Sequence, residues 1–156
     1  MIESNISIED FKNSAGAELG PSDWLLIDQE RINRFADATN DHQFIHVDPK
    51  KAAATPFGTT IAHGFLSLSI LPHLLAQIIP IPDGIVMGIN YGADRVRFSL
   101  PVKVDSRVRA SARIEKVSAR SGGQFMVKTK VTLEIENRKR PAVVADILSL
   151  YVVALD

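Results

Sequence analysis

The chain has 156 residues, of which 46% are hydrophobic and 23% charged, and this composition predicts one soluble globular domain over residues 1–156 rather than a disordered chain. The absence of cysteine excludes disulfides, thiolate metal sites and a cysteine nucleophile. The formal net charge of zero argues against a nucleic-acid-binding protein, although residues 95–120 hold eight bases and two acids and form a candidate surface for an anionic ligand.

The N-terminal segment, MIESNISIEDFKNSAG, lacks the basic start and apolar run of a signal peptide. The longest apolar segment, residues 61–79, is interrupted by two histidines, a proline and a glutamine, so a buried helix is a better interpretation than a membrane span. We therefore expect a cytoplasmic protein with no membrane partner.

The first half of the chain predicts helices with recognisable starts. A short helix is expected within residues 7–15 and a strand at 23–28. Asp28 is a plausible N-cap for a helix from Gln29 to about Thr39, because its carboxylate can accept an unpaired first-turn N–H. A second short helix is expected at 48–54, where Asp48 caps and Pro49 occupies the first helical position.

The apolar segment from about Ala62 to Ile79 predicts one long helix wrapped by other structure, with Pro72 bending it or opening its hydrogen bonding. After it the sequence alternates between apolar and polar residues, as in half-buried strands. Strands are expected near 85–91, 95–99, 107–114 and 124–135, followed by a last strand over 142–155 that is apolar on both faces. This layout is α+β, with an antiparallel sheet folded around one central helix.

The stretch TNDHQFIHVD, residues 39–48, carries candidate chemistry. Asp41 and His46 could share one water, taking a proton from it and giving one back, or they could be a capping carboxylate and a core histidine. A metal site of His42 and His46 with further ligands is a weaker alternative, because the helix that this spacing needs is interrupted here. The apolar residues Phe44, Ile45 and Val47 are expected to pin the segment to the core.

A second stretch, GTTIAHGF at residues 58–65, precedes the apolar helix. Unpaired N–H groups at a helix start carry the positive end of the helix dipole, so Gly64 could let a substrate carbonyl approach and could stabilise developing negative charge. The glycine could instead serve only the close packing of the helix.

FADATNDHQFIHVDPKKA and the later PFGTTIAHGFLSLSILPHLL resemble the motif of the MaoC-like (R)-specific enoyl-CoA hydratases, Asp-x-x-x-x-His-x-Asp followed by Ala-His-Gly. MGINYGADRVRFSLPVKVDSRVRASARI resembles the strands that follow, especially in the nodulation-protein-N-like branch, which Gln43-Phe44 also matches in place of the Asn-Pro of many relatives. The resemblance covers residues 23 to 153.

This resemblance implies a hotdog fold, a homodimer and an acyl-CoA substrate, in fatty acid metabolism. It places the catalytic pair at Asp41 and His46, the N–H that meets the thioester carbonyl at Gly64, and a supporting, substrate-binding residue at His63. The implied reaction is a reversible syn addition of water to a trans-2-enoyl-CoA, giving a (3R)-3-hydroxyacyl-CoA, with no cofactor and no metal. A hotdog acyl-CoA thioesterase and a non-catalytic acyl-CoA-binding subunit are the alternatives.

The phosphates of CoA need cationic partners, and arginine suits them best. The candidates for this role are the basic residues of the later strands: Arg95, Arg97, Lys103, Arg107, Arg109 and Arg113. Arg95, Arg97 and Arg107 are predicted to bind substrate, although Arg107 lies on a different strand from the other two. A solvated strand face is the other interpretation of this set.

Overall fold

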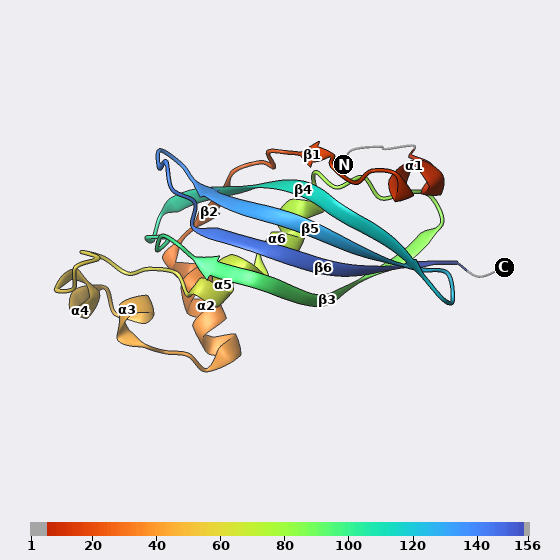
Figure 1. The fold of residues 1–156 in the computed structure, drawn as a ribbon. Coiled ribbons are helices and arrows are strands. Elements are labelled where there is room, and N and C mark those ends of the chain that lie inside the picture. Colours follow the sequence, from red (N-terminus) through yellow and green to blue (C-terminus); the bar gives the residue numbers. More distant parts are fainter. Residues whose placement is uncertain (1–5, 155–156) are drawn as a thin grey trace.

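The computed structural model describes residues 6–154 and shows a curved antiparallel sheet that covers a pair of short helices (Figure 1). The strand order is β1-β4-β5-β6-β3, and β2 also pairs with β4. The strands are β1 (Glu18–Leu19), β2 (Leu25–Ile27), β3 (Ile85–Phe98), β4 (Ser106–Arg120), β5 (Gln124–Ile135) and β6 (Val143–Val153). The α+β prediction of an antiparallel sheet around helical structure is confirmed.

The helices are α1 (Ile8–Lys12), α2 (Gln29–Thr39), α3 (Phe44–Val47), α4 (Pro49–Ala53), α5 (Gly64–Ser69) and α6 (Leu71–Leu75). Both predicted N-caps are confirmed: the Asp28 side chain accepts from the Arg31 N–H, and the Asp48 side chain accepts from the Lys51 N–H ahead of Pro49. In Figure 1, α2, α3 and α4 lie together at one end of the sheet, below β3. None of the helices in residues 6–154 is long and apolar enough to cross a bilayer.

The predicted long helix over 62–79 is wrong in its continuity. The structure divides it into α5 and α6, which meet at Ile70. Pro72 lies in the first turn of α6, where its missing N–H leaves no hydrogen bond unmade, so the chain starts a new helix there. Leu66 of α5 and Leu71 and Leu74 of α6 are buried against the sheet.

The alternation in the strands is confirmed by burial. Along β4, Val108, Ala110, Ala112 and Ile114 are all buried in the core. β6 lies between β5 and β3, which explains why its sequence is apolar on both faces. The core therefore sits between the inner face of the sheet and the two short helices.

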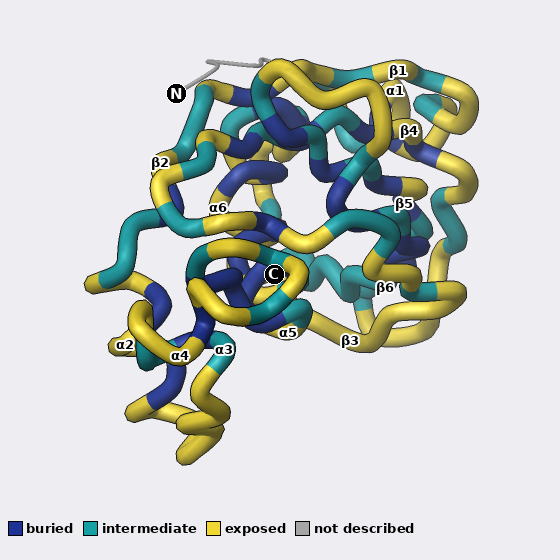
Figure 2. The backbone as a smooth tube through the Cα atoms, turned by 90° about the vertical axis from the view of Figure 1, so that its left-hand side faces the viewer, coloured by how far each residue is buried: buried dark blue, intermediate teal, exposed yellow. Residues whose placement is uncertain are grey.

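The two strands expected near 85–91 and 95–99 are instead one strand, β3, at the edge of the sheet. Its pairing with β6 shifts register at Ile85/Met87, Asn90/Gly92 and Asp94/Arg97, and each shift gives β3 one residue more than β6. The shifts at Asn90/Gly92 and Asp94/Arg97 lie at the gap that was expected between two strands. Most of β3 is exposed, and Figure 2 shows this as a continuous yellow stretch along the strand.

Candidate active site

Asp41 follows directly after the end of α2. Asn40 adopts a left-handed conformation, with φ of 56°, and this turn ends the helix. The Asp41 N–H then donates to the Ala36 carbonyl at 3.1 Å. The side chain of Asp41 is 56% exposed, so its carboxylate projects from the turn instead of capping it.

His46 lies in α3 and is buried. Its Nδ1 is 2.7 Å from the carbonyl oxygen of Ile61. Because a carbonyl only accepts, Nδ1 carries the hydrogen and the neutral ring has its lone pair on Nε2. A histidine fixed in this tautomer can accept a proton from water through Nε2.

The backbone around His46 is also held by hydrogen bonds. The Gln29 amide donates to the His46 carbonyl at 2.7 Å, and its oxygen accepts from the hydroxyl of Thr60, which is fully buried. The Ile61 N–H donates to the Ile45 carbonyl at 3.0 Å. Residues 45–46 are thereby tied both to α2 and to the chain before α5.

The prediction that apolar side chains pin this segment is wrong for Phe44, which is 42% exposed. Ile45 and Val47 are only half-buried. The hydrogen bonds made by Gln29 and Ile61 do the anchoring instead. No sequence signal identified Gln29 or Thr60 as supports, because each acts across a long interval of chain.

His63 lies beside both predicted catalytic residues. Its Nε2 is 2.9 Å from the Asp41 carbonyl oxygen and 4.0 Å from a carboxylate oxygen of the same residue. Its ring stacks on that of His46, with centroids 3.8 Å apart and the planes 24° from parallel. The structure therefore brings Asp41, His46 and His63 together.

Gly64 is the first residue of α5, and the first-turn N–H groups of a helix have no acceptor within the helix. A Cβ at this position would lie 2.9 Å from Cγ and Cδ2 of Phe98, which is closer than side-chain atoms approach. The packing interpretation of this glycine is therefore supported, and it is compatible with the approach of a substrate.

His46 and Gly64 both line a cavity of about 290 Å³. Its walls come from the residues before α5, from the end of β3 and the segment that follows it, and from the start of β6, including Phe98, Val102 and Val143. Asp41 is not part of this wall.

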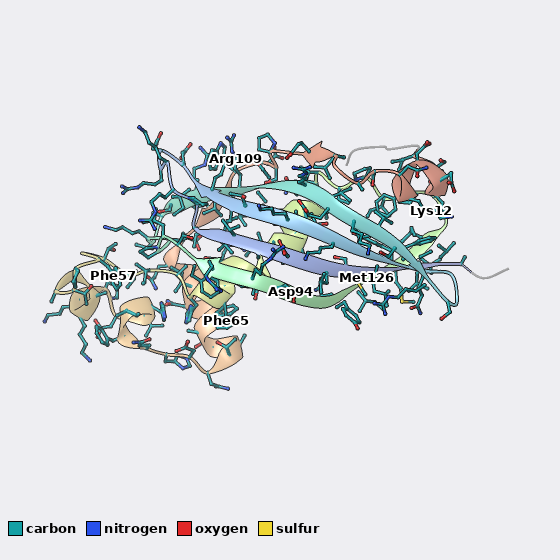
Figure 3. All side chains as sticks on the ribbon, viewed as in Figure 1. Lys12, Phe57, Phe65, Asp94, Arg109 and Met126 are labelled. Atoms are coloured by element: carbon teal, nitrogen blue, oxygen red, sulfur yellow. The ribbon has the colours of Figure 1, made fainter. Side chains whose placement is uncertain are left out.

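In Figure 3, Phe57 and Phe65 lie toward the end of the molecule that carries α3 and α4, whereas Lys12 and Met126 lie toward the other end.

Burial lowers the pKa of His46 below its usual value, because the charged ring loses solvation. The nearby His63 acts in the same direction, whereas the hydrogen bond to Ile61 and the charge of Asp41 oppose it. His46 is therefore largely neutral at neutral pH, which is the state a general base requires.

The same cluster bears on the metal alternative. One ligand atom each from Asp41, His46 and His63 lie within 4.8 Å of one another. The two rings are stacked, however, so their in-plane lone pairs run along nearly parallel planes instead of converging on one ion. His42 points elsewhere, with Nε2 2.8 Å from Asp37 at the surface, so the pair of His42 and His46 is not brought together.

The basic residues predicted to bind substrate lie outside the wall of the His46 cavity. Arg95 donates through Nε to Asp146 at 2.6 Å, and Arg107 pairs with Glu136 at 3.1 Å. Arg97 donates to the Val96 carbonyl and is exposed. A basic residue that was not predicted, Arg140, donates to the Ser99 carbonyl at the edge of the cavity. The only sequence feature that drew attention to Arg140 was its place in the basic turn ENRKRP.

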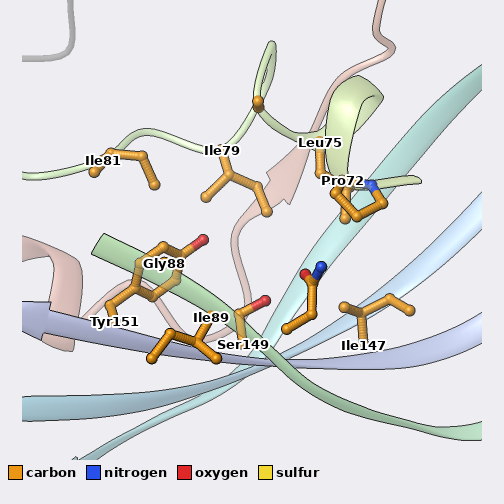
Figure 4. A pocket seen from close by; sticks show the side chains of 11 residues that line it. Pro72, Leu75, Ile79, Ile81, Gly88, Ile89, Ile147, Ser149 and Tyr151 are labelled. Atoms are coloured by element: carbon orange, nitrogen blue, oxygen red, sulfur yellow. The ribbon is translucent and has the colours of Figure 1, made fainter. Parts of the chain in front are cut away.

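A second cavity, of about 240 Å³, lies between α6 and the paired strands β3 and β6 (Figure 4). Its lining is mostly apolar and includes Pro72, Leu75, Ile147 and Tyr151. The predicted catalytic residues are absent from its wall, and the apolar lining suits apolar groups.

A sheet wrapped around helices, with a carboxylate and a neutral histidine beside a helix start, defines a hotdog protein equipped for proton transfer. The model of the MaoC like domain matches residues 10–137, and the chain belongs to this family. It is therefore an enzyme of the hydratase and dehydratase type, a hydro-lyase.

The chain is 48% identical over 146 residues to 3-hydroxyacyl-thioester dehydratase Z of Mycobacterium tuberculosis, covering 94% of this chain and 96% of that protein. It is 47% identical to nodulation protein N of Rhizobium leguminosarum, covering 93% and 91% respectively. The crystal structure of the MaoC-like dehydratase from Rhodospirillum rubrum superposes with a TM-score of 0.76, covering 97% of this chain and 99% of that chain, at 17% identity. This last similarity supports the fold alone.

Proposed function

We propose that the protein catalyses the reversible syn hydration of trans-2-enoyl-CoA to (3R)-3-hydroxyacyl-CoA. The observation that carries the proposal is the tautomer of His46, whose Nδ1 donates to Ile61 and whose Nε2 is therefore a base. The similarity to a dehydratase of 3-hydroxyacyl thioesters supports the same substrate class.

In the proposed reaction, Asp41 and His46 hold one water molecule. One of them removes a proton from the water, the oxygen bonds to C3, and the π electrons of the C2–C3 double bond move toward the thioester carbonyl. The resulting enolate takes a proton at C2 from the Asp41 and His46 pair, which restores the protonation state of the pair, so one water is added and no other group leaves. The Gly64 N–H hydrogen-bonds the enolate oxygen, an effect of about 3–4 kcal/mol in comparable oxyanion sites.

We also propose that the protein acts as a homodimer in the cytoplasm. The exposed edge strand β3 supports the dimer, because it carries the exposed side chains of Val86, Met87, Ile89 and Tyr91. An unpaired strand with apolar side chains is a natural site for pairing with a second copy. Light scattering coupled to gel filtration tests this, and a monomer at micromolar concentration would contradict it.

Incubation with a short trans-2-enoyl-CoA should remove the absorbance of the conjugated thioester without releasing free thiol. Chiral analysis of the product should give the (3R) isomer, and a series of acyl chain lengths defines the substrate range. Stoichiometric release of thiol would instead indicate a thioesterase, and binding without turnover would indicate an acyl-CoA-binding subunit.

Substitution tests the two proton-transfer residues. Asp41→Asn and His46→Ala should each lower the rate by about two to four orders of magnitude, as expected for general acid and base groups. The chain offers a matched control in Asp37 and His42, an exposed aspartate and histidine with the same spacing. Asp37→Asn and His42→Ala should retain the rate, and a rate that survives at Asp41 or His46 would refute the assignment.

A further inference from the structure

His63 adjoins the predicted catalytic pair and the predicted carbonyl-binding glycine, each in a different way. Its Nε2 donates to the backbone carbonyl of Asp41, its ring stacks on His46, and the next residue in the chain is Gly64. The side chain is only 3% exposed. A residue with these contacts controls how the three groups lie relative to one another.

The position of the Asp41 carboxylate depends on its backbone, because the side chain itself is exposed and stands 4.0 Å from His63. The peptide groups of Asp41 are held on both sides: its N–H donates to the Ala36 carbonyl at 3.1 Å, and its carbonyl accepts from His63 at 2.9 Å. The first bond belongs to the end of α2. The second ties the turn to the start of α5.

The His63 ring is fixed between two other rings. His46 stacks on it at 3.8 Å, and Phe35 of α2 lies at 5.0 Å with an interplanar angle of 55°. Turning the ring over would place a carbon opposite the Asp41 carbonyl and break the hydrogen bond. The Nδ1 atom is buried and has no hydrogen-bond partner among residues 6–154. The polar contact of this side chain is therefore made through Nε2.

We infer that His63 is a positioning residue that sets Asp41 against His46 through the hydrogen bond from Nε2. This inference rests on the function proposed above. Proton transfer by His63 itself does not fit the geometry, because Nε2 is engaged with the Asp41 carbonyl and Nδ1 is buried. A role as core filler predicts that any ring of similar size would serve.

Three substitutions separate these roles. In His63→Gln the side-chain amide nitrogen takes the position of the histidine Nε2 and can still donate to the Asp41 carbonyl. In His63→Asn the shorter side chain brings its amide nitrogen only to the position of Nδ1. His63→Phe keeps the ring and removes the donor. We expect kcat to fall about 10- to 100-fold in the Asn and Phe variants, as for a small misplacement of a catalytic group. The Gln variant should stay within about five-fold of the wild type, and KM should change by less than about three-fold in all of them.

The exposed His73 provides the matched control, and His73→Asn should retain the wild-type rate. Combining His63→Phe with Asp41→Asn gives a further readout: if His63 acts through Asp41, the double variant should be no slower than Asp41→Asn alone. Three results would each overturn the inference: full activity of the Phe variant, a Gln variant as slow as the Asn variant, or losses that multiply in the double variant.

Measurements that need no turnover keep this test separate from the proposed function. In the wild-type protein, imidazole ¹⁵N shifts should show the hydrogen of His63 on Nε2. Amide exchange at Asp41 should accelerate in the Phe variant and not in the Gln variant. An inactive wild-type protein that shows both results would refute the proposed reaction and leave the positioning role supported, whereas a hydrogen on Nδ1 alone would refute that role. If the Asn variant does not fold, the comparison of Gln with Phe decides the outcome.

Discussion

Replacing Gly64 by alanine tests both interpretations of this glycine. The added Cβ would lie 2.9 Å from the ring of Phe98, where carbon atoms normally stand at about 3.5–4.0 Å, so the ring must yield by about 1 Å. Overpacking of this kind costs about 1–3 kcal/mol, and the lower end applies because Phe98 is 46% exposed on an edge strand. Alanine also loses less backbone entropy than glycine on folding, which offsets part of this cost. The free energy of unfolding should therefore fall by no more than about 1 kcal/mol.

The effect of Gly64→Ala on catalysis should be much larger. If the methyl group keeps the thioester oxygen from the Gly64 N–H, kcat should fall by about 10²–10³-fold, as when an oxyanion donor is lost elsewhere. Enoyl-CoA hydration measures this change, and chemical denaturation measures the stability. A variant with wild-type kcat would refute the role of Gly64.

The displaced Phe98 is a second possible cause of lost activity, and a double variant separates the two. With Phe98→Ala as the reference, Gly64→Ala should regain its lost stability, because the clash has gone. Its kcat should still fall by about 10²-fold or more, because the methyl group still covers the N–H. Recovery of the rate in the double variant would show that the moved ring, and not the blocked donor, caused the loss.

The remaining predictions concern pH and the supporting contacts. Because the pKa of His46 is lowered, kcat/KM should fall only as the pH drops below the usual histidine value, and an acid limb above that value in the pH profile would contradict the role as base. Gln29→Leu should cost about 1–3 kcal/mol in denaturant unfolding, since the buried Thr60 hydroxyl loses its acceptor, and kcat should fall with it. Thr60→Val, which removes the donor, should cost less than Gln29→Leu. Burial raises the pKa of the Asp146 carboxyl, but hydrogen bonds from Arg95 and Lys128 outweigh it, so this pKa is lowered. The ionised carboxylate therefore stabilises the fold at neutral pH, and this stabilisation is lost as the pH falls through the lowered pKa. Asp146→Asn should therefore reduce the acid dependence of the melting temperature.

The elements that the sequence predicted well are those decided by neighbouring residues. Asp28 and Asp48 cap helices through bonds that span three residues, and the alternation in β4 needs only one buried face. An irregularity at Pro72 was expected, but not that one helix would end at Ile70 and another begin. A proline can bend a helix or begin a new one, and only the surrounding core decides between them.

The site was predicted through its motif and not through its contacts. The spacing of Asp41 and His46 left several interpretations open, and the family resemblance selected one. The hydrogen bonds from Gln29 to His46 and from Thr60 to Gln29 span 17 and 31 residues, so no local sequence pattern predicts them. Arg95 is a similar case: its pairing with Asp146 depends on the register of β3 against β6, and no local sequence pattern indicates it.

The irregular pairing of β3 also bears on aggregation. A long exposed edge strand with apolar side chains can recruit unrelated strands, and uninterrupted ladders are the most hazardous. The three register shifts divide β3 into short runs and give it one extra residue at each shift, including Arg95 in a left-handed conformation. An ordinary straight strand cannot follow such an edge along its whole length. The shape of this edge thus selects against chance partners.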